Sequence, residues 1–493
     1  MSKPKQEFFS SRLGIVLSMI GVAVGAGNIW RFSRIVAQNG GGSFVVAWVI
    51  FLFIWSIPLI IAEIALGKKA RKAPIGALAK IGGRKMGWMG AFVAVVATGI
   101  MCYYSVIVGW GLRYFFYGVS GTLAKTEDFH SLWTNFSTSA QPLIFHILTL
   151  VVGCFIILKG VVRGIERTNK ILIPILLLII FIIFVRALTL PGAMGGIKYF
   201  YTPVWSDLLN YRIWIEALTQ NAWDTGAGWG LLLVYAGYMH RRESVVVNGC
   251  LTAFSNNAVS LIMGMTIFAT VFALESDFGI QQLISGEGST QVGIAFIFLP
   301  KLFNQLPGGP LVHSSFASLF FLAFYFAALS STISMIQLTS QTIAELGVEK
   351  KSAILFTGIL ALLVGIPSAI SITFLENQDT VWGLGLLLSG LFIAISVISY
   401  GVNRFREDAI NISKQDFKIK KFYNAFIMCV IPAQAIVLIS WFFYHIICCV
   451  DSEGWWNPLR PFSAGTIIMQ WGVCITVFIV FNKWLVKKTL KKY

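Results

Sequence analysis

Apolar runs of about 20 residues recur along the whole chain of 493 residues. A run of this length crosses the hydrocarbon core of a bilayer as an α-helix, whereas barrel strands would show alternating segments of about ten residues. Because 57% of the residues are apolar and only 12% are charged, neither a soluble fold nor a disordered chain fits the composition. The pattern predicts an all-α polytopic membrane protein.

The runs predict twelve transmembrane helices, with ends set to within a few residues. Their limits are 13–37, 43–66, 88–117, 142–159, 171–188, 213–239, 248–274, 313–344, 352–373, 380–402, 423–447 and 464–486. The chain is then divided into a cytoplasmic N-terminal tail (1–12), helices one to five (13–188), helices six to ten (189–402), and a last part (403–493). The last part holds a cytoplasmic loop, helices eleven and twelve, and a short C-terminal tail.

Most of the 38 Lys and Arg residues lie in short clusters between alternate spans. Cytoplasmic loops carry such an excess, so both termini are predicted to be cytoplasmic, in a plasma (inner) membrane. Only Lys125, Lys198, Arg212, Lys301 and Arg460 lie clearly on the opposite side. The net charge of +17 therefore indicates a chain adapted to the lipid bilayer and not one that binds nucleic acid.

Two spans differ from the rest in their glycine content. The first contains GVAVGAGNIWRF (Gly21–Phe32), and the sixth contains NAWDTGAGWG (Asn221–Gly230). Each glycine weakens a helix by roughly 1 kcal/mol relative to alanine, and close helix packing is the plain explanation. However, Asn28 and Asp224 lie in the same stretches, and a carboxylate at membrane depth is by default a functional residue.

The two glycine-rich spans are the first and the sixth, an arrangement typical of transporters built from inverted repeats. Broken helices expose N–H groups that favour an anion and carbonyl groups that favour a cation. The sequence therefore predicts a site near the middle of the membrane for a small zwitterion together with a cation.

Six motifs occur in order along the chain, each on its expected span. They are SRLG…AVGAGNIWRF…NGGGSF (Ser11–Phe44), CYYSVIVGW (Cys102–Trp110), GIERTNKILIP (Gly164–Pro174), DTGAGWG…YAGY (Asp224–Tyr238), FLPKLFNQLPGG (Phe298–Gly309) and AALSSTISMIQ (Ala327–Gln337). In these motifs the chain resembles the neurotransmitter:sodium symporter family, whose archetype is the bacterial leucine transporter. The resemblance implies a 5+5 inverted-repeat core with broken helices one and six, and sodium-driven uptake of a small amine or amino acid.

The resemblance also implies two sodium sites, and sodium prefers oxygen ligands. The first site would use the carbonyl oxygen of Ala23, the side-chain oxygens of Asn28 and Asn256, and the residue at position 224, here Asp224. The second would use the carbonyl oxygens of Gly21, Val24 and Ala327 and the hydroxyls of Ser330 and Ser331. The alternative for the two serines is that they bond only to their own helix.

Asp224 stands where the family usually has serine or threonine. Chloride-dependent members hold an anion near this point, and its ligands would map to Trp48, Gln220, Asp224 and Ser260. Trp48 replaces a tyrosine and offers only an N–H donor, while the carboxylate of Asp224 would repel chloride. We therefore infer that Asp224 is the counter-anion of the first sodium ion and that chloride is not required.

Gly25 lies in the break of helix one, where monoamine carriers of the family have an aspartate. A glycine leaves room for the carboxylate of the substrate itself, which favours a neutral, hydrophobic amino acid over an amine. The substrate-binding residues implied by the resemblance are Ala23, Gly25, Ile100, Tyr104, Trp223, Gly226, Trp229, Ser331 and Met335. Trp229 makes the pocket smaller and Gly226 makes it larger, so the size of the substrate stays open.

Two gates are implied as well. Arg31 and Asp379 would form the outer gate, and the alternative is that both only snorkel to the membrane interface. Tyr238 and Glu345 match the inner gate of the family.

Three further features concern helices two and five and the N-terminus. The arginine expected near the N-terminus is replaced by Gln6, beside Lys5. Glu63 in helix two is expected to hydrogen-bond the broken part of helix six. Gly164 and Pro174 would let helix five unwind toward the inside, or they would form a plain cap and kink.

The leading interpretation is a sodium-coupled symporter for a neutral amino acid. A proton-coupled carrier is the alternative within transport, because Asp224 could itself take up a proton. A substrate-gated channel or sensor with the same fold is a third class, although no continuous polar stripe favours a channel. An enzyme is not expected, since HExxH, GxSxG and Cys/His clusters are missing from the sequence. The sequence leaves a homodimer open.

Overall fold

The computed structural model describes residues 7–274, 293–412, 417–450 and 452–490, a part of the chain that is helical and contains no strand. Its α-helices are α1 (Arg12–Ala23), α2 (Ala26–Ile29), α3 (Arg31–Gln38), α4 (Gly42–Phe51), α5 (Ile57–Ala70), α6 (Pro74–Ile81), α7 (Gly87–Val119), α8 (Thr122–Lys125), α9 (Phe129–Ser137), α10 (Gln141–Leu158), α11 (Arg167–Leu188), α12 (Ala193–Tyr201), α13 (Tyr211–Asp224), α14 (Leu231–Ala236), α15 (Val245–Leu274), α18 (Leu299–Phe303), α19 (Gly309–Glu345), α20 (Lys350–Ile370), α21 (Ile372–Tyr400), α22 (Val402–Phe405), α23 (Phe422–Ala425), α24 (Ile431–His445), α25 (Ala464–Val480) and α26 (Asn482–Thr489). Shorter π and 3-10 segments are η1 (Leu52–Ser56), η2 (Arg84–Met86), η3 (Val161–Glu166), η4 (Trp205–Leu209), η5 (Ile294–Phe298), η6 (Arg406–Ile410), η7 (Phe426–Val430) and η8 (Ile446–Val450).

Within the described residues, nine continuous segments are long and apolar enough to cross a membrane. They are Gly42–Ala70, Arg84–Val119, Gln141–Leu158, Val161–Leu188, Val245–Leu274, Gly309–Glu345, Lys350–Ile370, Ile372–Tyr400 and Phe422–Val450. A tenth span is α25, from which α26 turns away by 66°. The remaining two are the broken spans, α1 to α3 and α13 to α14, which completes the twelve predicted helices.

Three predicted ends were wrong. The fifth span begins at Val161 and not at 171, because η3 continues into α11 and carries its charged residues along the inner part of the helix. The tenth begins at Ile372 and not at 380, since two carboxylates that look extramembranous in the sequence line a cavity instead. The apolar part of the twelfth ends at Val480 and not at 486.

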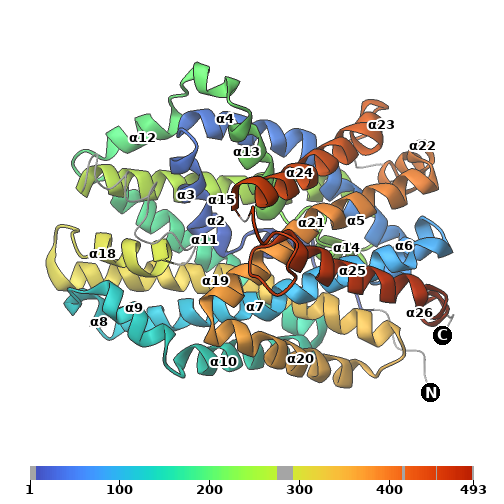
Figure 1. The fold of residues 1–493 in the computed structure, drawn as a ribbon, viewed down its shortest axis with the longest axis horizontal. Helices are drawn as coiled ribbons and strands as arrows, with labels where there is room; N and C mark the ends of the chain where they lie inside the picture. The colour runs from blue at the N-terminus through green and yellow to red at the C-terminus, as the bar shows by residue number, and fades with distance from the viewer. Residues whose placement is uncertain (1–6, 275–292, 413–416, 451, 491–493) are drawn as a thin grey trace.

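The long helices α7 and α19 pack along each other through the middle of the bundle (Figure 1). In the apolar stretch of α19, 83% of the residues are buried inside the protein, but in the stretch that includes α24 only 22% are. Large apolar side chains such as Phe155, Phe181 and Val437 are exposed on the outer helices. These helices therefore present their apolar surface to lipid, as a bilayer-spanning bundle requires.

The two ends of the bundle differ in charge. Figure 1 shows α6, α22 and α26 at one end and α8, α12 and α18 at the other. At the first end, Arg71 donates to the carbonyl of Met239 at 3.0 Å, and Lys350 pairs with Glu7 at 2.7 Å. Segments that the charge pattern places together on one side of the membrane are therefore in contact.

Candidate functional site

The two broken helices approach each other at the centre of the bundle. α1 ends at Ala23, two extended residues follow, and α2 begins at Ala26. α13 ends at Asp224, and in the break that follows Gly226 has a φ of +70°, which glycine adopts readily. A Cβ on Gly226 would lie 3.6 Å from the Cα of Ala23, so the backbones of the two breaks are neighbours.

Glu63 of α5 holds the second break in place. Its carboxylate is fully buried and accepts hydrogen bonds from the N–H groups of Gly228 at 2.8 Å and Leu233 at 3.2 Å. Backbone groups freed by a break at membrane depth need such partners. The role predicted for Glu63 is confirmed.

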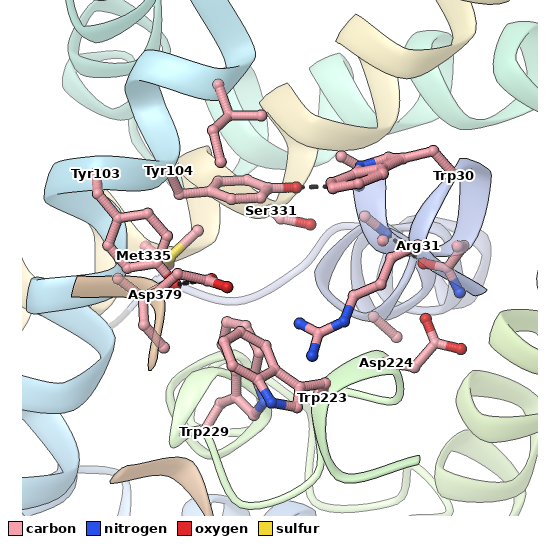
Figure 2. Close-up of a pocket in the computed structure, with 18 of the residues that line it drawn as sticks. Trp30, Arg31, Tyr103, Tyr104, Trp223, Asp224, Trp229, Ser331, Met335 and Asp379 are labelled. Carbon is pink, nitrogen blue, oxygen red and sulfur yellow. Dashed lines mark hydrogen bonds between the residues drawn. The ribbon is translucent and has the colours of Figure 1, made fainter. Parts of the chain in front are cut away.

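A cavity of about 90 Å³ lies between the two breaks and helices α7, α19 and α21. All nine predicted substrate-binding residues line it, namely Ala23, Gly25, Ile100, Tyr104, Trp223, Gly226, Trp229, Ser331 and Met335. Figure 2 shows the tyrosines of α7 on one side of this cavity and Trp223 with Trp229 on the other. The structure thus brings the nine residues together, while their contact with a substrate stays a prediction.

Other residues line the cavity that the sequence did not single out. They are Val22, Ala26, Gly27, Trp30, Tyr103, Ile107, Phe296, Leu375 and Glu376. Ile107 follows Ile100 and Tyr104 at the spacing of one helix face, so the period of α7 could have identified it. Phe296 comes from η5, and no local pattern connects it with the broken helices.

Oxygen atoms converge at the first predicted sodium site. One terminal atom of the Asn256 side-chain amide lies 3.0 Å from the carbonyl oxygens of both Ala23 and Asp224, and the hydrogen bonds of Asn28 assign it as the oxygen. Its orientation follows from a chain of hydrogen bonds. The N–H of Gly25 donates to Asn28 Oδ1 at 2.7 Å, and Asn28 Nδ2 then donates to Asn256 Oδ1 at 2.8 Å. Three oxygens therefore face one another, a set that suits a cation.

These hydrogen bonds give Asn28 a structural role that the sequence does not reveal. Its side-chain oxygen, predicted to face sodium, accepts the hydrogen bond from Gly25, and its amide also donates to Ser260 Oγ at 2.8 Å. Asn28 thereby ties the first break to α15.

Asp224 is buried, with 6% of its surface exposed. Its Oδ2 accepts a hydrogen bond from Ser260 Oγ at 2.8 Å, but its Oδ1 has no hydrogen-bond partner among the described residues. The indole N–H of Trp48 is likewise buried and unpartnered in this part of the chain. A carboxylate with one free oxygen therefore lies next to the convergent oxygens.

The second predicted sodium site lies between α1 and α19. Ser331 Oγ is 3.2 Å from the carbonyl oxygen of Val24 across the break and 3.4 Å from that of Ala327 on its own helix. Ser330 donates to Ala327 at 2.8 Å, so this serine does bond back to its own helix. Gly21 lies against Ser330, where a Cβ would be 3.3 Å from the serine Cβ. All five predicted residues are thus neighbours.

On the outer side, Arg31 and Asp379 both line the cavity. The guanidinium of Arg31 lies 4.4 Å from the ring centroid of Trp223, and Asp379 accepts a hydrogen bond from Tyr103 at 2.8 Å (Figure 2). Trp223 packs on Gly383, where a Cβ would lie 1.6 Å from the ring, so a larger residue would displace this aromatic lid.

The inner side is sealed by hydrogen bonds. Tyr238 accepts a hydrogen bond from Gln337 at 2.6 Å, and its carbonyl oxygen accepts from the N–H of Phe9, whose side chain is buried. Glu345 accepts from the N–H of Ala73 at 2.8 Å. The structure is therefore closed toward the basic end of the bundle.

Glu7 is an inner contact that the sequence did not predict. Its carboxylate pairs with Lys350 at 2.7 Å and accepts from the N–H of Val161 at 2.7 Å. Partial burial raises the pKa of Glu7, but the bonds from Lys350 and Val161 outweigh it and lower the pKa below its usual value. The contact is therefore kept at neutral pH and lost as the pH falls through this lowered pKa. Lys5 and Gln6, considered for this gate, lie outside the described residues.

Comparisons with known proteins agree with this geometry. A family model described as the sodium:neurotransmitter symporter family matches residues 6–141 and 125–491. An uncharacterized sodium-dependent transporter of Methanocaldococcus jannaschii is 30% identical over 464 residues, which cover 89% of this chain and 91% of that protein. The uncharacterized sodium-dependent transporter YhdH of Bacillus subtilis is 33% identical over 422 residues, which cover 80% of this chain and 89% of that protein. The crystal structure of MhsT in complex with L-phenylalanine matches with a TM-score of 0.76 and 28% identity, covering 88% of this chain and 99% of MhsT.

Proposed function

The chain belongs to the sodium:neurotransmitter symporter family and is a sodium-dependent transporter of a small substrate, and we propose that this substrate is a neutral, hydrophobic amino acid. Two sodium ions would enter with each amino acid, as cargo and driving force. The protein would expose its central cavity to one side of the membrane and then to the other.

The space around Gly25 carries this proposal. A Cβ on Gly25 would lie 3.2 Å from Tyr104 Oη and 3.3 Å from Ser331 Oγ, so only the missing side chain leaves room there. Tyr104 Oη accepts a hydrogen bond from the N–H of Ala26 at 3.0 Å, which leaves its own proton for a substrate carboxylate. The N–H groups of Gly25 and Ala26 are already used, so the hydroxyl of Tyr104 and the first sodium ion are the proposed partners of the carboxylate.

The other half of the cavity supports a hydrophobic side chain. It is lined by Ile100, Ile107, Phe296, Met335 and Trp229. Binding sites for small ligands combine such apolar walls with a few placed polar groups. The matched structure of MhsT holds L-phenylalanine, which is consistent with an aromatic or large aliphatic substrate here.

Asp224 supports transport without chloride. Its carboxylate lies beside the first oxygen cluster, where it would compensate the charge of a sodium ion permanently. When sodium leaves, this buried carboxylate would favour a proton. We therefore propose proton counter-transport on the return step. A purely proton-coupled carrier is the second candidate, favoured by the unpartnered Oδ1 of Asp224.

The placement in the membrane is also a proposal. The basic end of the bundle, with Arg71 and Lys350, would face the cytoplasm of a plasma membrane, because positive residues are retained on that side. Both chain termini would then be cytoplasmic, and the closed inner side would separate the cavity from the cytoplasm.

A thermal-shift screen tests the proposal. The purified protein is heated with each of the twenty amino acids, in sodium and in choline medium. A ligand at 100 times its Kd adds about 2.7 kcal/mol of stability, which is readily detected. Stabilisation by hydrophobic amino acids in sodium alone is expected. Equal stabilisation in choline would refute sodium coupling, and a response to amines only would refute the substrate class.

A further inference from the structure

The boundary of α1, α11 and α19 encloses a buried amide without a partner. Asn169 of α11 is 0% exposed, and neither its amide nitrogen nor its oxygen has a hydrogen-bond partner among the residues that the structure describes. Leaving a buried polar group unpaired is unfavourable, so native proteins usually place a water or an ion at such a site.

Asn169 lies directly behind the second sodium site. The point that a Cβ on Gly21 would occupy is 3.1 Å from Asn169 Oδ1, 3.2 Å from Ile173 Cδ1 and 3.3 Å from Ser330 Cβ. The glycine thus brings Asn169 and Ser330 to the same face of α1. Asn169 does not line the substrate cavity.

Further oxygens continue along the same boundary. Ser18 is fully buried, and its hydroxyl is unpartnered in the described part of the chain. Gly14, Ser18 and Gly21 share one face of α1. At the far end of this face, a Cβ on Gly14 would lie 2.0 Å from the carboxylate of Glu166. Glu166 is 1% exposed and pairs with Lys170 at 2.7 Å near the inner end of the bundle.

We propose that Asn169 is a sodium ligand on the inner side of the second site, which holds the ion as it leaves along α1 toward Glu166. The amide oxygen is the neutral, hard donor that sodium accepts, and the ion would be shared with the predicted ligands Gly21 and Ser330. The proposal rests on the second sodium site proposed above. It explains why a fully buried amide has no protein partner.

The test compares two transport modes in proteoliposomes with radiolabelled L-phenylalanine. Net uptake requires sodium to be released from the protein on the inner side of the membrane. In exchange, saturating sodium and phenylalanine are present on both faces of the membrane. The protein then does not have to change conformation without bound ions. Asn169→Leu should lower net uptake roughly tenfold, the loss of one bond to a charged group, with exchange within about twofold of wild type. Asn169→Asp adds a negative charge and should raise the apparent sodium affinity while it slows net uptake.

Thr149→Val is the matched control. Thr149 lies on α10, is fully buried and has an unpartnered hydroxyl within the described residues, but it is not a predicted sodium ligand and does not line the substrate cavity. This variant should keep the wild-type ratio of net uptake to exchange.

Two failures are distinguishable. If the wild-type protein binds no hydrophobic amino acid more tightly in sodium than in choline, the proposed function fails and the role of Asn169 falls with it. If wild-type binding is sodium-linked but Asn169→Leu keeps the wild-type ratio and Asn169→Asp keeps the wild-type sodium affinity, the role of Asn169 alone is overturned. A water-filled structural gap would give this second result.

Discussion

The two oxygen clusters of this protein differ in how they could compensate the charge of a cation. The first has the side-chain oxygen of Asn256, two carbonyl oxygens and the carboxylate of Asp224 close by. The second is made of carbonyl groups and the hydroxyls of Ser330 and Ser331. The first can therefore compensate a cation with a fixed negative charge, whereas the second offers only dipoles.

The two clusters should therefore respond to different changes in the protein. A fixed charge attracts sodium over several ångströms, at roughly 4 kcal/mol for unit charges 4 Å apart at an effective dielectric of about 20. Dipoles act only at contact distance. Ser331 meets Val24 across the gap between α1 and α19, so any separation of these helices would release the second ion first. We therefore propose that the first cluster mainly affects substrate binding and that the second mainly affects the conformational change.

The largest expected effect is that of removing sodium from both clusters. Without the cations, a substrate carboxylate at the centre of the membrane loses its main charge partner. Amino-acid affinity should fall roughly 100-fold or more when choline replaces sodium, given an ion-pair energy of several kcal/mol. Scintillation proximity binding measures it, and equal affinity in the two media would contradict both clusters at once.

Gly25→Asp should place a second carboxylate beside the first cluster. A Cβ at this position already meets Tyr104 and Ser331 within 3.3 Å, so the new side chain would occupy the space of the substrate carboxylate. Amino-acid binding should be lost, while decarboxylated amines such as tyramine should gain affinity relative to wild type. Competition binding checks this exchange of preference. If amines compete as well as amino acids for the wild-type protein, the position assigned to the substrate carboxylate is wrong.

Ser331→Ala probes the second cluster from a residue that also lines the substrate cavity. Loss of one hydroxyl bonded to a charged group should weaken sodium binding roughly tenfold, judged by the sodium concentration that gives half-maximal substrate binding. Asn28→Ala should have a comparable effect on the first cluster. Thr332→Ala is the control, because the neighbouring buried hydroxyl of Thr332 bonds only to Ala328 of its own helix at 2.9 Å. Equal sodium affinity in Ser331→Ala and Thr332→Ala would place the ion elsewhere.

The smallest effect is expected from chloride. With Asp224 as fixed anion, wild-type uptake should keep most of its rate when gluconate replaces chloride. Asp224→Ser removes the charge and should lose proton counter-transport, and a chloride requirement should emerge, if necessary after Trp48→Tyr. Uptake in gluconate and chloride media, with a pH indicator inside the vesicles, measures both. A wild-type protein that stops in gluconate would contradict the difference drawn between the clusters.

Much of the site could be read from local sequence. Gly226 and Gly25 stand out because glycine in a membrane helix has a clear physical cost, and Asp224 because a carboxylate does. Partners distant in sequence could not be read in this way. Tyr103 and Asp379 are 276 residues apart, and Asn28 and Asn256 are 228 apart. The resemblance supplied Asn28 with Asn256, but neither Tyr103 with Asp379 nor Glu7 with Lys350.

The class of the protein, its twelve spans and the positions of both breaks follow from the sequence. A bilayer accepts only long apolar helices, and departures from that rule are visible residue by residue. Only the tertiary structure decided which oxygens face one another. The orientation of Asn256 depends on Asn28 and Gly25, and the isolation of Asn169 depends on the space left by Gly21. Such arrangements arise from the packing of helices that are distant in the chain, and no local pattern encodes them.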